Sequence, residues 1–226
     1  MNGHSAKNNM KKPLITIITA AWHVDGMPKV LESLKNQTYQ NFHHIIINDN
    51  NPEIREWLKE NNFFDEDPRT FVIDSHVRTH YYGGLVRNMG VIASFSYLHA
   101  SLRDIDNEWV TFHDDDNAWT PDHLESMVET MNTVPFASMI GADMVMLGAV
   151  DKTYREERKC ELRHCYCDLG SFLYKTKLFR EYGYFFPHPH RKHKFDWELI
   201  EKFAKAEEGK VALTNKPTFL MNYKKK

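Results

Sequence analysis

The sequence lacks several features that would place the chain in other protein classes. It has only 3 cysteines among 226 residues, and three thiols cannot all pair within one chain. We therefore expect a reducing compartment, the cytoplasm. No apolar run approaches the length of a membrane span, so we expect no transmembrane segment. Residues 1–12 lack the apolar core of a signal peptide and are predicted to form a flexible lead-in.

A surplus of positive charge is also missing. The chain has 29 Lys and Arg against 31 Asp and Glu, which gives a formal net charge of −2. Proteins that bind nucleic acids generally carry a basic surplus, so we expect no nucleic-acid partner. Hydrophobic residues are plentiful, at 42%, and exclude disorder of the whole chain. The length favours a single domain over residues 13–226.

Strand and helix patterns alternate through residues 13–131. Short apolar runs at 14–19, 42–47, 71–73 and 109–112 are typical of buried strands. Helices are predicted after each run, with Asn51 and Pro52 as one helix start and Leu85, Met89, Ile92 and Ala93 as the inner face of a helix over 84–101. This alternation predicts an α/β fold with a mostly parallel sheet and helices on both faces.

Residues 132–226 are less regular. We expect strands at 142–147, 171–174, 211–213 and 218–222, and a helix over 197–206. Residues 151–167 are charged and predicted to be loop. The three final lysines form either a solvated tail or the point at which a larger protein, with this chain as one module, continues.

Three adjacent carboxylates, Asp114, Asp115 and Asp116, follow the strand at 109–112 directly. In open α/β sheets, ligands bind at the carboxyl ends of the strands. Adjacent carboxylates repel one another, and a hard divalent cation such as Mg²⁺ or Mn²⁺ would relieve that repulsion. The alternative is a solvated acidic turn that caps the next helix. The position after a buried strand favours a metal site.

Four motifs in order resemble glycosyltransferase family 2. The segment from Leu31 to Phe42 (LESLKNQTYQNF) is similar to the family's helix and turn, and the strand ending at Asn48 and Asp49 resembles its "DDGS" segment. Residues 84–90 (GLVRNMG) resemble its "ARN.G" block, and residues 109–121 (WVTFHDDDNAWTP) resemble the block with the Asp-x-Asp motif. The resemblance implies a GT-A fold, with a Rossmann-like sheet whose nucleotide-binding half is 13–131 and whose acceptor and sugar half is 132–226.

The resemblance also implies roles on the donor side. Thr19, Ala20 and Ala21 occupy the family's first nucleotide-binding loop, where Trp22 would replace a missing tyrosine. Asp49 would bind the uracil edge of a UDP-linked sugar, and Arg87 the base or the diphosphate. Asp114 and Asp115 would face the ribose and the sugar. The implied ligands of a Mn²⁺ or Mg²⁺ ion are Asp116 and Asp114.

On the acceptor side, residues 195–199 (FDWEL) resemble the family's "ED..L" block. Asp196 aligns with the catalytic aspartate, which implies an inverting transferase that moves the sugar to the hydroxyl of a carbohydrate or glycoconjugate. Glu198 is the rival base, although two residues along a helix point it to another face. The remaining candidate contacts of sugar or acceptor are Asp168, Gly170, His193 and Trp197.

Other interpretations remain open. Cys160, His164, Cys165 and Cys167 offer zinc ligands, but their spacing fits no common site. A sugar nucleotidyltransferase would share the doubly wound sheet, but it usually has a Gly-rich loop after the first strand, and residues 19–25 contain no glycine. A non-catalytic domain that only binds sugar nucleotides is the other alternative.

Overall fold

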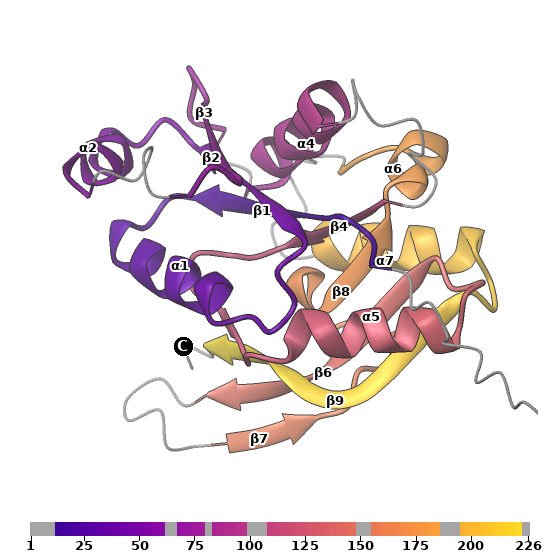
Figure 1. Ribbon diagram of the computed structural model, residues 1–226. Helices are drawn as coiled ribbons and strands as arrows, with labels where there is room; N and C mark the ends of the chain where they lie inside the picture. The colour runs from indigo at the N-terminus through magenta and orange to yellow at the C-terminus, as the bar shows by residue number, and fades with distance from the viewer. Residues whose placement is uncertain are drawn as a thin grey trace, which may run out of the picture.

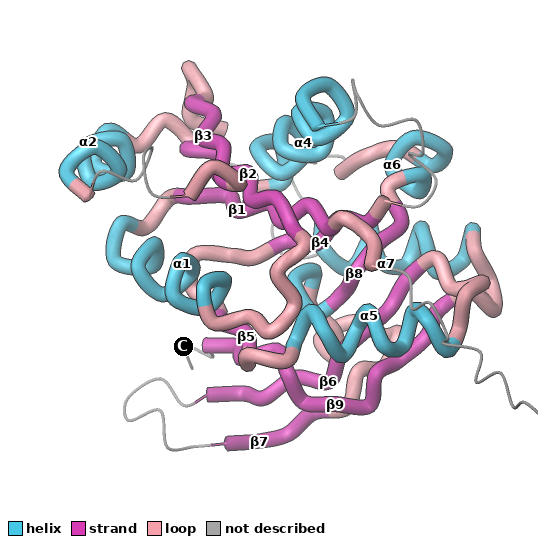
Figure 2. The backbone as a smooth tube through the Cα atoms, viewed as in Figure 1, coloured by secondary structure: helices cyan, strands magenta, loops and turns pink. Residues whose placement is uncertain are grey.

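The computed structural model of the protein describes residues 12–61, 67–79, 83–98, 108–147, 155–185 and 195–222. These ranges build a nine-stranded sheet with helices packed against it (Figures 1 and 2). The strands are β1 (Ile15–Ala21), β2 (Phe42–Asn48), β3 (Thr70–Asp74), β4 (Trp109–Phe112), β5 (Ala118–Trp119), β6 (Met139–Leu147), β7 (Arg155–Arg158), β8 (Phe172–Lys175) and β9 (Val211–Asn222). The α-helices are α1 (Met27–Lys35), α2 (Pro52–Glu60), α4 (Gly84–Ala93), α5 (His123–Thr133), α6 (Lys177–Tyr182) and α7 (Phe195–Ala206).

The strand order across the sheet is β3-β2-β1-β4-β8-β6-β9-β5, and β7 pairs with β6 outside this path. Strands β3, β2, β1 and β4 are parallel to one another, as the alternation in residues 13–131 predicts. Strands β6 and β9 are also parallel. The antiparallel pairs β4–β8, β6–β8, β6–β7 and β5–β9 all include a strand later than β4. The predicted α/β fold is therefore confirmed, and the antiparallel pairing extends its sheet.

Helices cover both faces of the sheet because side chains alternate along each strand. Ile18 of β1 packs in one buried cluster with residues of α4, α6 and α7. Its neighbour Ile17 packs in a second cluster with residues of α1 and α5. Figure 1 shows the consequence, with α4 on one side of β1 and α1 on the other.

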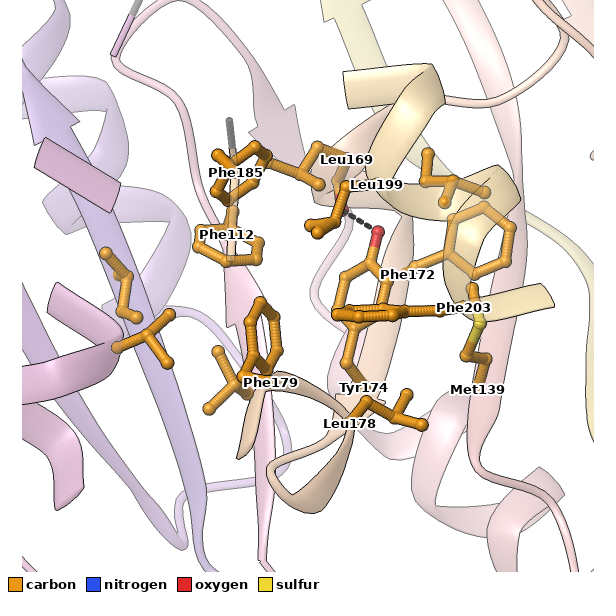
Figure 3. Packing of buried hydrophobic residues seen from close by; sticks show 14 of the residues in the cluster. Phe112, Met139, Leu169, Phe172, Tyr174, Leu178, Phe179, Phe185, Leu199 and Phe203 are labelled. Atoms are coloured by element: carbon orange, nitrogen blue, oxygen red, sulfur yellow. Dashed lines mark hydrogen bonds between the residues drawn. The ribbon is translucent and has the colours of Figure 1, made fainter. Parts of the chain in front are cut away.

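An aromatic core on the α4 side holds the end of β4 in place (Figure 3). Phe112, the last residue of β4, is fully buried and makes edge-on contacts with Tyr174 and Phe179 at ring-centroid distances of 6.0 Å. The buried hydroxyl of Tyr174 donates a hydrogen bond to the carbonyl oxygen of Leu169 over 3.2 Å. Because the acidic turn begins directly after Phe112, this core fixes where that turn starts.

The helix predicted over 84–101 differs from the observed α4 in its length and in the residues that it buries. It is α-helical only to Ala93 and continues as a π-helix over Ser94–Leu98, while residues 99–101 lie outside the described ranges. Ile92, predicted to face inward, is 49% exposed, whereas Val86 and Val91 are buried. The helix lies so close to β1 that a Cβ on Gly90 would be 2.5 Å from Cγ2 of Ile18. This close approach, which only glycine permits, sets the rotation of α4.

The second half also departs from the prediction in two places. Strand β7 lies within residues 151–167, for which the sequence predicts a loop. The two predicted closing strands form one strand, β9, whose pairing with β6 shifts register near Asp143. The division into halves at residue 131 stays a prediction, and residues 1–11 of the predicted lead-in lie outside the described ranges. No helix of the described part is both long and apolar enough to cross a membrane.

Candidate active site

The carboxyl ends of β1, β2 and β4 and the start of α4 surround one cavity of about 450 Å³. Convergence of these ends is what the parallel pairing of the three strands predicts. The cavity contains four carboxylates and two guanidinium groups. Its lining residues are Ala20, Trp22, His23, Asp49, Arg78, Gly83, Val86, Arg87, Asp114, Asp115 and Asp116.

Asp115 joins the acidic turn to the loop after β1. Its Oδ2 accepts hydrogen bonds from the backbone N–H groups of Trp22 and His23, at 2.7 and 2.6 Å. Its Oδ1 lies 3.1 Å from Nδ1 of His23. A Cβ on Gly26 would overlap the backbone carbonyl of Asp115, so the two loops touch without a side chain between them. Asp115 therefore holds the cavity floor together, in addition to lining it.

Arg87 connects the acidic turn to the second half of the chain. Its guanidinium is ion-paired with Asp114 and lies 3.8 Å from Oδ1 of Asp196. The side chain of Arg87 is only 7% exposed, whereas that of Asp196 is 43% exposed. Burial opposes the charge of Arg87, but the carboxylates of Asp114 and Asp196 outweigh burial and raise its pKa. The guanidinium of Arg87 is thus paired both with Asp196, the predicted base, and with Asp114 of the Asp-x-Asp motif.

Partial burial also changes the pKa of Asp196. It raises the pKa of this carboxyl, and the charge of Asp114 acts in the same direction, while Arg87 opposes both. A carboxylate with a raised pKa is a better proton acceptor. The role of Asp196 as the base stays a prediction, and this direction of its pKa is compatible with it.

Asp116 lies exposed at the cavity, one residue beyond the floor. Loss of hydration, together with the charges of Asp114 and Asp115, raises the pKa of Asp116 to about 6. A cation beside Asp116 would relieve this repulsion, and its oxygens suit Mg²⁺ or Mn²⁺. Within the described ranges, no group of three or more His, Cys, Asp or Glu side chains is arranged around a metal position. The donor set nevertheless fits Mg²⁺, which commonly uses one or two carboxylates together with substrate phosphates.

Asp49 faces the cavity from the end of β2 and contacts the loop after β3. Its Oδ1 accepts a hydrogen bond from the backbone N–H of Thr79 at 2.8 Å, and its Oδ2 accepts one from the Thr79 hydroxyl at 3.2 Å. Asn48, at the preceding position, is fully buried and donates to Asp74 and to the carbonyl of Asn51. Asn48 thus shapes the turn and does not face the cavity.

The first nucleotide-binding loop reaches the cavity only in part. Ala20 and Trp22 line it, whereas Thr19 and Ala21 are fully buried. Thr19 is 2.8 Å from Nε2 of His44 on the other face of the sheet. The side chains of Thr19 and Ala21 thus point away from the cavity, because successive side chains of β1 point to opposite faces, and only backbone contacts of these two residues with a nucleotide stay a prediction.

The residues predicted to contact the sugar or the acceptor lie in different surroundings. The charge of Asp168 helps to raise the pKa of Arg87. Oδ1 of Asp168 accepts a hydrogen bond from the backbone N–H of Gly170 at 2.9 Å. Burial raises the pKa of Asp168, as do the nearby charges of Asp114 and Asp196.

Gly170 packs closely under β4. A Cβ at this position would be 2.7 Å from the carbonyl oxygen of Phe112, so the site requires glycine, and its predicted contact with the sugar or acceptor stays a prediction. Trp197 packs against the aromatic core, Glu198 is half-buried, and His193 lies outside the described residues.

The zinc alternative gains no support from the structure. Cys160 is buried, and its backbone N–H donates to Asp143, whereas Cys165 is exposed beside His164. Among the described residues these side chains do not form a metal-binding group.

Sequence reasoning missed Arg78, a cavity residue in the loop after β3. The guanidinium carbon of Arg78 lies 3.4 Å from the centroid of the Trp22 ring, and its neighbour Thr79 contacts Asp49. The loop follows a strand end, which is a signal for a site, but no local pattern distinguishes Arg78 from a solvated arginine.

Comparison with known proteins agrees with this geometry. The family model described as "Glycosyl transferase family 2" matches residues 16–194. The fold resembles that of S. aureus TarS 1–349 in complex with UDP-GlcNAc, with a TM-score of 0.69 and 14% identity over 95% of this chain and 59% of that one. It also resembles the mannosyltransferase PcManGT from Pyrobaculum calidifontis in complex with GDP-Man and Mn²⁺, with a TM-score of 0.65 and 11% identity over 97% and 59% of the two chains.

The chain thus spans about three fifths of the length of these structures, and at these identities the likeness concerns the fold. No curated protein matches the sequence significantly.

Proposed function

The chain belongs to glycosyl transferase family 2, and on this basis we propose that it is a glycosyltransferase that moves a sugar from a UDP-linked donor to an acceptor hydroxyl with inversion at the sugar carbon. The proposal assigns Asp196 as the general base and a divalent cation as cofactor. The acceptor is a carbohydrate or a glycoconjugate. The three free cysteines support the cytoplasm as its compartment.

One observation carries this proposal. Arg87 contacts both Asp114, from the end of β4, and Asp196, from the first turn of α7. The ion pairs hold a carboxylate from the second half of the chain beside the cavity formed by the first half. Inverting transfer needs this arrangement, because a base must reach the acceptor hydroxyl while the leaving group departs on the other side of the sugar carbon.

The roles of the side chains follow from their surroundings. Asp196, which is 43% exposed, accepts the proton of the acceptor hydroxyl as the new bond forms. Arg87 orients Asp196 toward the cavity. Asp49 accepts an N–H of the nucleobase, and Trp22 offers a ring for stacking. Asp116 and Asp114 would hold the divalent cation, which when bound neutralises charge that develops on the departing diphosphate.

Two of the similar structures bear on the donor. The TarS structure is a complex with UDP-GlcNAc, and the PcManGT structure is a complex with GDP-Man and Mn²⁺. Both uracil and guanine present a ring N–H that a carboxylate at the position of Asp49 can accept. We propose UDP because the segment around Asp49 resembles the family's uracil-binding segment.

The test is hydrolysis and transfer of UDP-linked sugars in the presence of Mn²⁺, with two variants compared. Asp196→Asn should slow turnover by about a hundred- to ten-thousand-fold, the usual contribution of a positioned general base, with UDP affinity almost unchanged. Glu198→Gln, on another face of the same helix, should be milder.

A dead Glu198→Gln with an active Asp196→Asn would reverse the two roles. Failure to release a nucleoside diphosphate from any of the UDP-, GDP- or dTDP-linked sugars, by protein that nevertheless binds them, would favour the non-catalytic alternative.

A further inference from the structure

The cavity has more negative than positive groups, although its proposed ligand is an anion. Four carboxylates line it against the two guanidinium groups of Arg78 and Arg87. A nucleoside diphosphate brings further negative charge into this space. Besides the divalent cation proposed above, a cationic side chain that is not already engaged with the carboxylates would favour its binding.

Arg87 is engaged in this way. Its side chain is 7% exposed, and its guanidinium forms ion pairs with Asp114 and Asp196. Moving Arg87 toward a ligand would remove the cation from Asp114, which is 17% exposed, and from Asp196, which is 43% exposed, and breaking ion pairs of the buried Arg87 is unfavourable. Arg87 is thus suited to orient these two groups and is poorly suited to hold the diphosphate.

Arg78 is in the opposite situation. It is exposed at the cavity, and no carboxylate within the described ranges lies at ion-pair distance from it. It contacts the face of Trp22, where its guanidinium carbon is 3.4 Å from the ring centroid. Stacking occupies the flat face of a guanidinium and leaves the N–H donors at its edge available.

Hydrogen bonds fix Trp22, which contacts Arg78, and Thr79, which follows Arg78 in the chain. These bonds limit the positions that the guanidinium of Arg78 can reach. The backbone of Trp22 is held twice, by the bond from its N–H to Asp115 and by the bond from Nδ2 of Asn51 to its carbonyl oxygen. Thr79, the residue after Arg78, is bonded twice to Asp49. A stacked arginine between two such anchors is oriented before any ligand arrives.

We propose that Arg78 is the side chain that binds the diphosphate of the sugar-nucleotide donor, with Trp22 as the platform that orients it. The ligand class is a nucleoside diphosphate, and the contact is a bidentate arginine–phosphate interaction. This inference rests on the proposed function and adds a residue that the family motifs do not include. Arg78 would also stabilise the diphosphate as it leaves.

The experiment measures binding of three probes in Mg²⁺: UDP, inorganic pyrophosphate, and uridine by competition against UDP. Arg78→Ala should weaken UDP and pyrophosphate by about 10- to 100-fold, the range expected for hydrogen bonds to a charged group, and leave uridine unchanged. Arg78→Lys keeps the charge but loses the fork and the stacking, so its effect should be intermediate.

A matched control exists elsewhere on the surface. The guanidinium carbon of Arg163 lies 3.2 Å from the centroid of the Tyr166 ring, outside the cavity. Arg163→Ala removes a stacked arginine that, unlike Arg78, is also ion-paired with Glu161 at 2.6 Å, and it should leave all three affinities unchanged. The melting temperature of each variant checks that the fold is intact.

Trp22 provides a second, independent readout. Pyrophosphate has no base to stack on Trp22, so Trp22→Ala should weaken pyrophosphate only through Arg78. The effect should therefore disappear when Arg78→Ala is already present. An effect of equal size in both backgrounds would contradict the platform role.

The remaining outcomes separate the two proposals. Unchanged UDP affinity in Arg78→Ala, with normal binding by the wild type, would overturn this inference alone. Equal weakening of uridine and UDP would place Arg78 on the nucleoside and would also overturn it. A wild-type protein that binds neither UDP nor pyrophosphate would overturn the proposed donor, and this inference with it.

Discussion

Replacement of His123 should reduce the sensitivity of the fold to acid by an amount that its surroundings define. His123 is fully buried at the start of α5, with Nδ1 2.8 Å from the hydroxyl oxygen of Thr218 and its ring stacked on Trp119 at 4.6 Å. Burial lowers the pKa of His123 to about 3, and the nearby His113 acts in the same direction. The folded protein therefore keeps this imidazole neutral well below pH 6.

The sign and size of the effect follow from linkage. In the unfolded chain His123 takes up a proton below its ordinary pKa of 6.5, whereas in the folded protein it does so only near pH 3. Its contribution to stability is thus complete above pH 6.5 and is lost as the pH falls from there toward 3. At about 1.4 kcal/mol per pKa unit, the loss between pH 7 and pH 5 is about 2 kcal/mol.

His123→Asn tests this by keeping a polar group near Thr218 while removing the titration. Urea unfolding at pH 7 and at pH 5 gives the free energy of unfolding of both proteins. The variant should be less stable than the wild type at pH 7, because it loses the stacked ring. Its decrease from pH 7 to pH 5 should, however, be about 2 kcal/mol smaller than that of the wild type.

The same replacement at an exposed histidine, His164→Asn, serves as the control for the substitution itself and should change the decrease less than His123→Asn does. Equal decreases in wild type and His123→Asn would refute the reasoning, because they would mean that the folded protein accepts a proton at this position without penalty.

Three further predictions concern the cavity and its support. Asp116→Ala should abolish the Mn²⁺-dependent part of UDP binding while the protein stays folded, and calorimetry with and without Mn²⁺ checks it; an unchanged metal dependence would remove Asp116 from the metal site. Asp49→Ala should weaken UDP more than inorganic pyrophosphate in the same assay, and equal weakening would limit Asp49 to holding Thr79. Gly90→Ala should lower the free energy of unfolding by about 1–3 kcal/mol, as overpacking does, because its Cβ would be 2.5 Å from Cγ2 of Ile18; a stability equal to wild type in urea would show that α4 moves away freely.

Local patterns in the sequence were sufficient to predict the parallel strands whose ends form the cavity. The apolar runs predict β1, β2 and β4, and the alternation with helices predicts their parallel pairing. The Asn51–Pro52 helix start is confirmed, because the side chain of Asn51 accepts a hydrogen bond from the backbone N–H of Glu53 at the start of α2. These features depend on neighbours in the chain, which is why the sequence alone reveals them.

Features that depend on distant partners could not be predicted in this way. Ile92 fits the apolar spacing of α4 but is exposed, because the contact of Gly90 with Ile18 rotates the helix. Asp115 looks equivalent to its acidic neighbours, yet its partners are 92 and 93 positions away in the chain. A residue's role in the cavity is decided by such contacts, which leave no periodic signal.

The contact between Gly26 and the acidic turn has a consequence for the thermodynamics of ligand binding. Because Asp115 bonds two backbone N–H groups of the loop after β1, and Gly26 lets the two loops touch, folding alone immobilises this part of the cavity. Ordering a side chain upon association usually opposes binding by about 0.5–1.5 kcal/mol. The floor has lost this conformational entropy before a ligand arrives, so we expect a smaller entropic penalty for nucleotide binding there, and a larger residue at position 26 should make the entropy of binding less favourable.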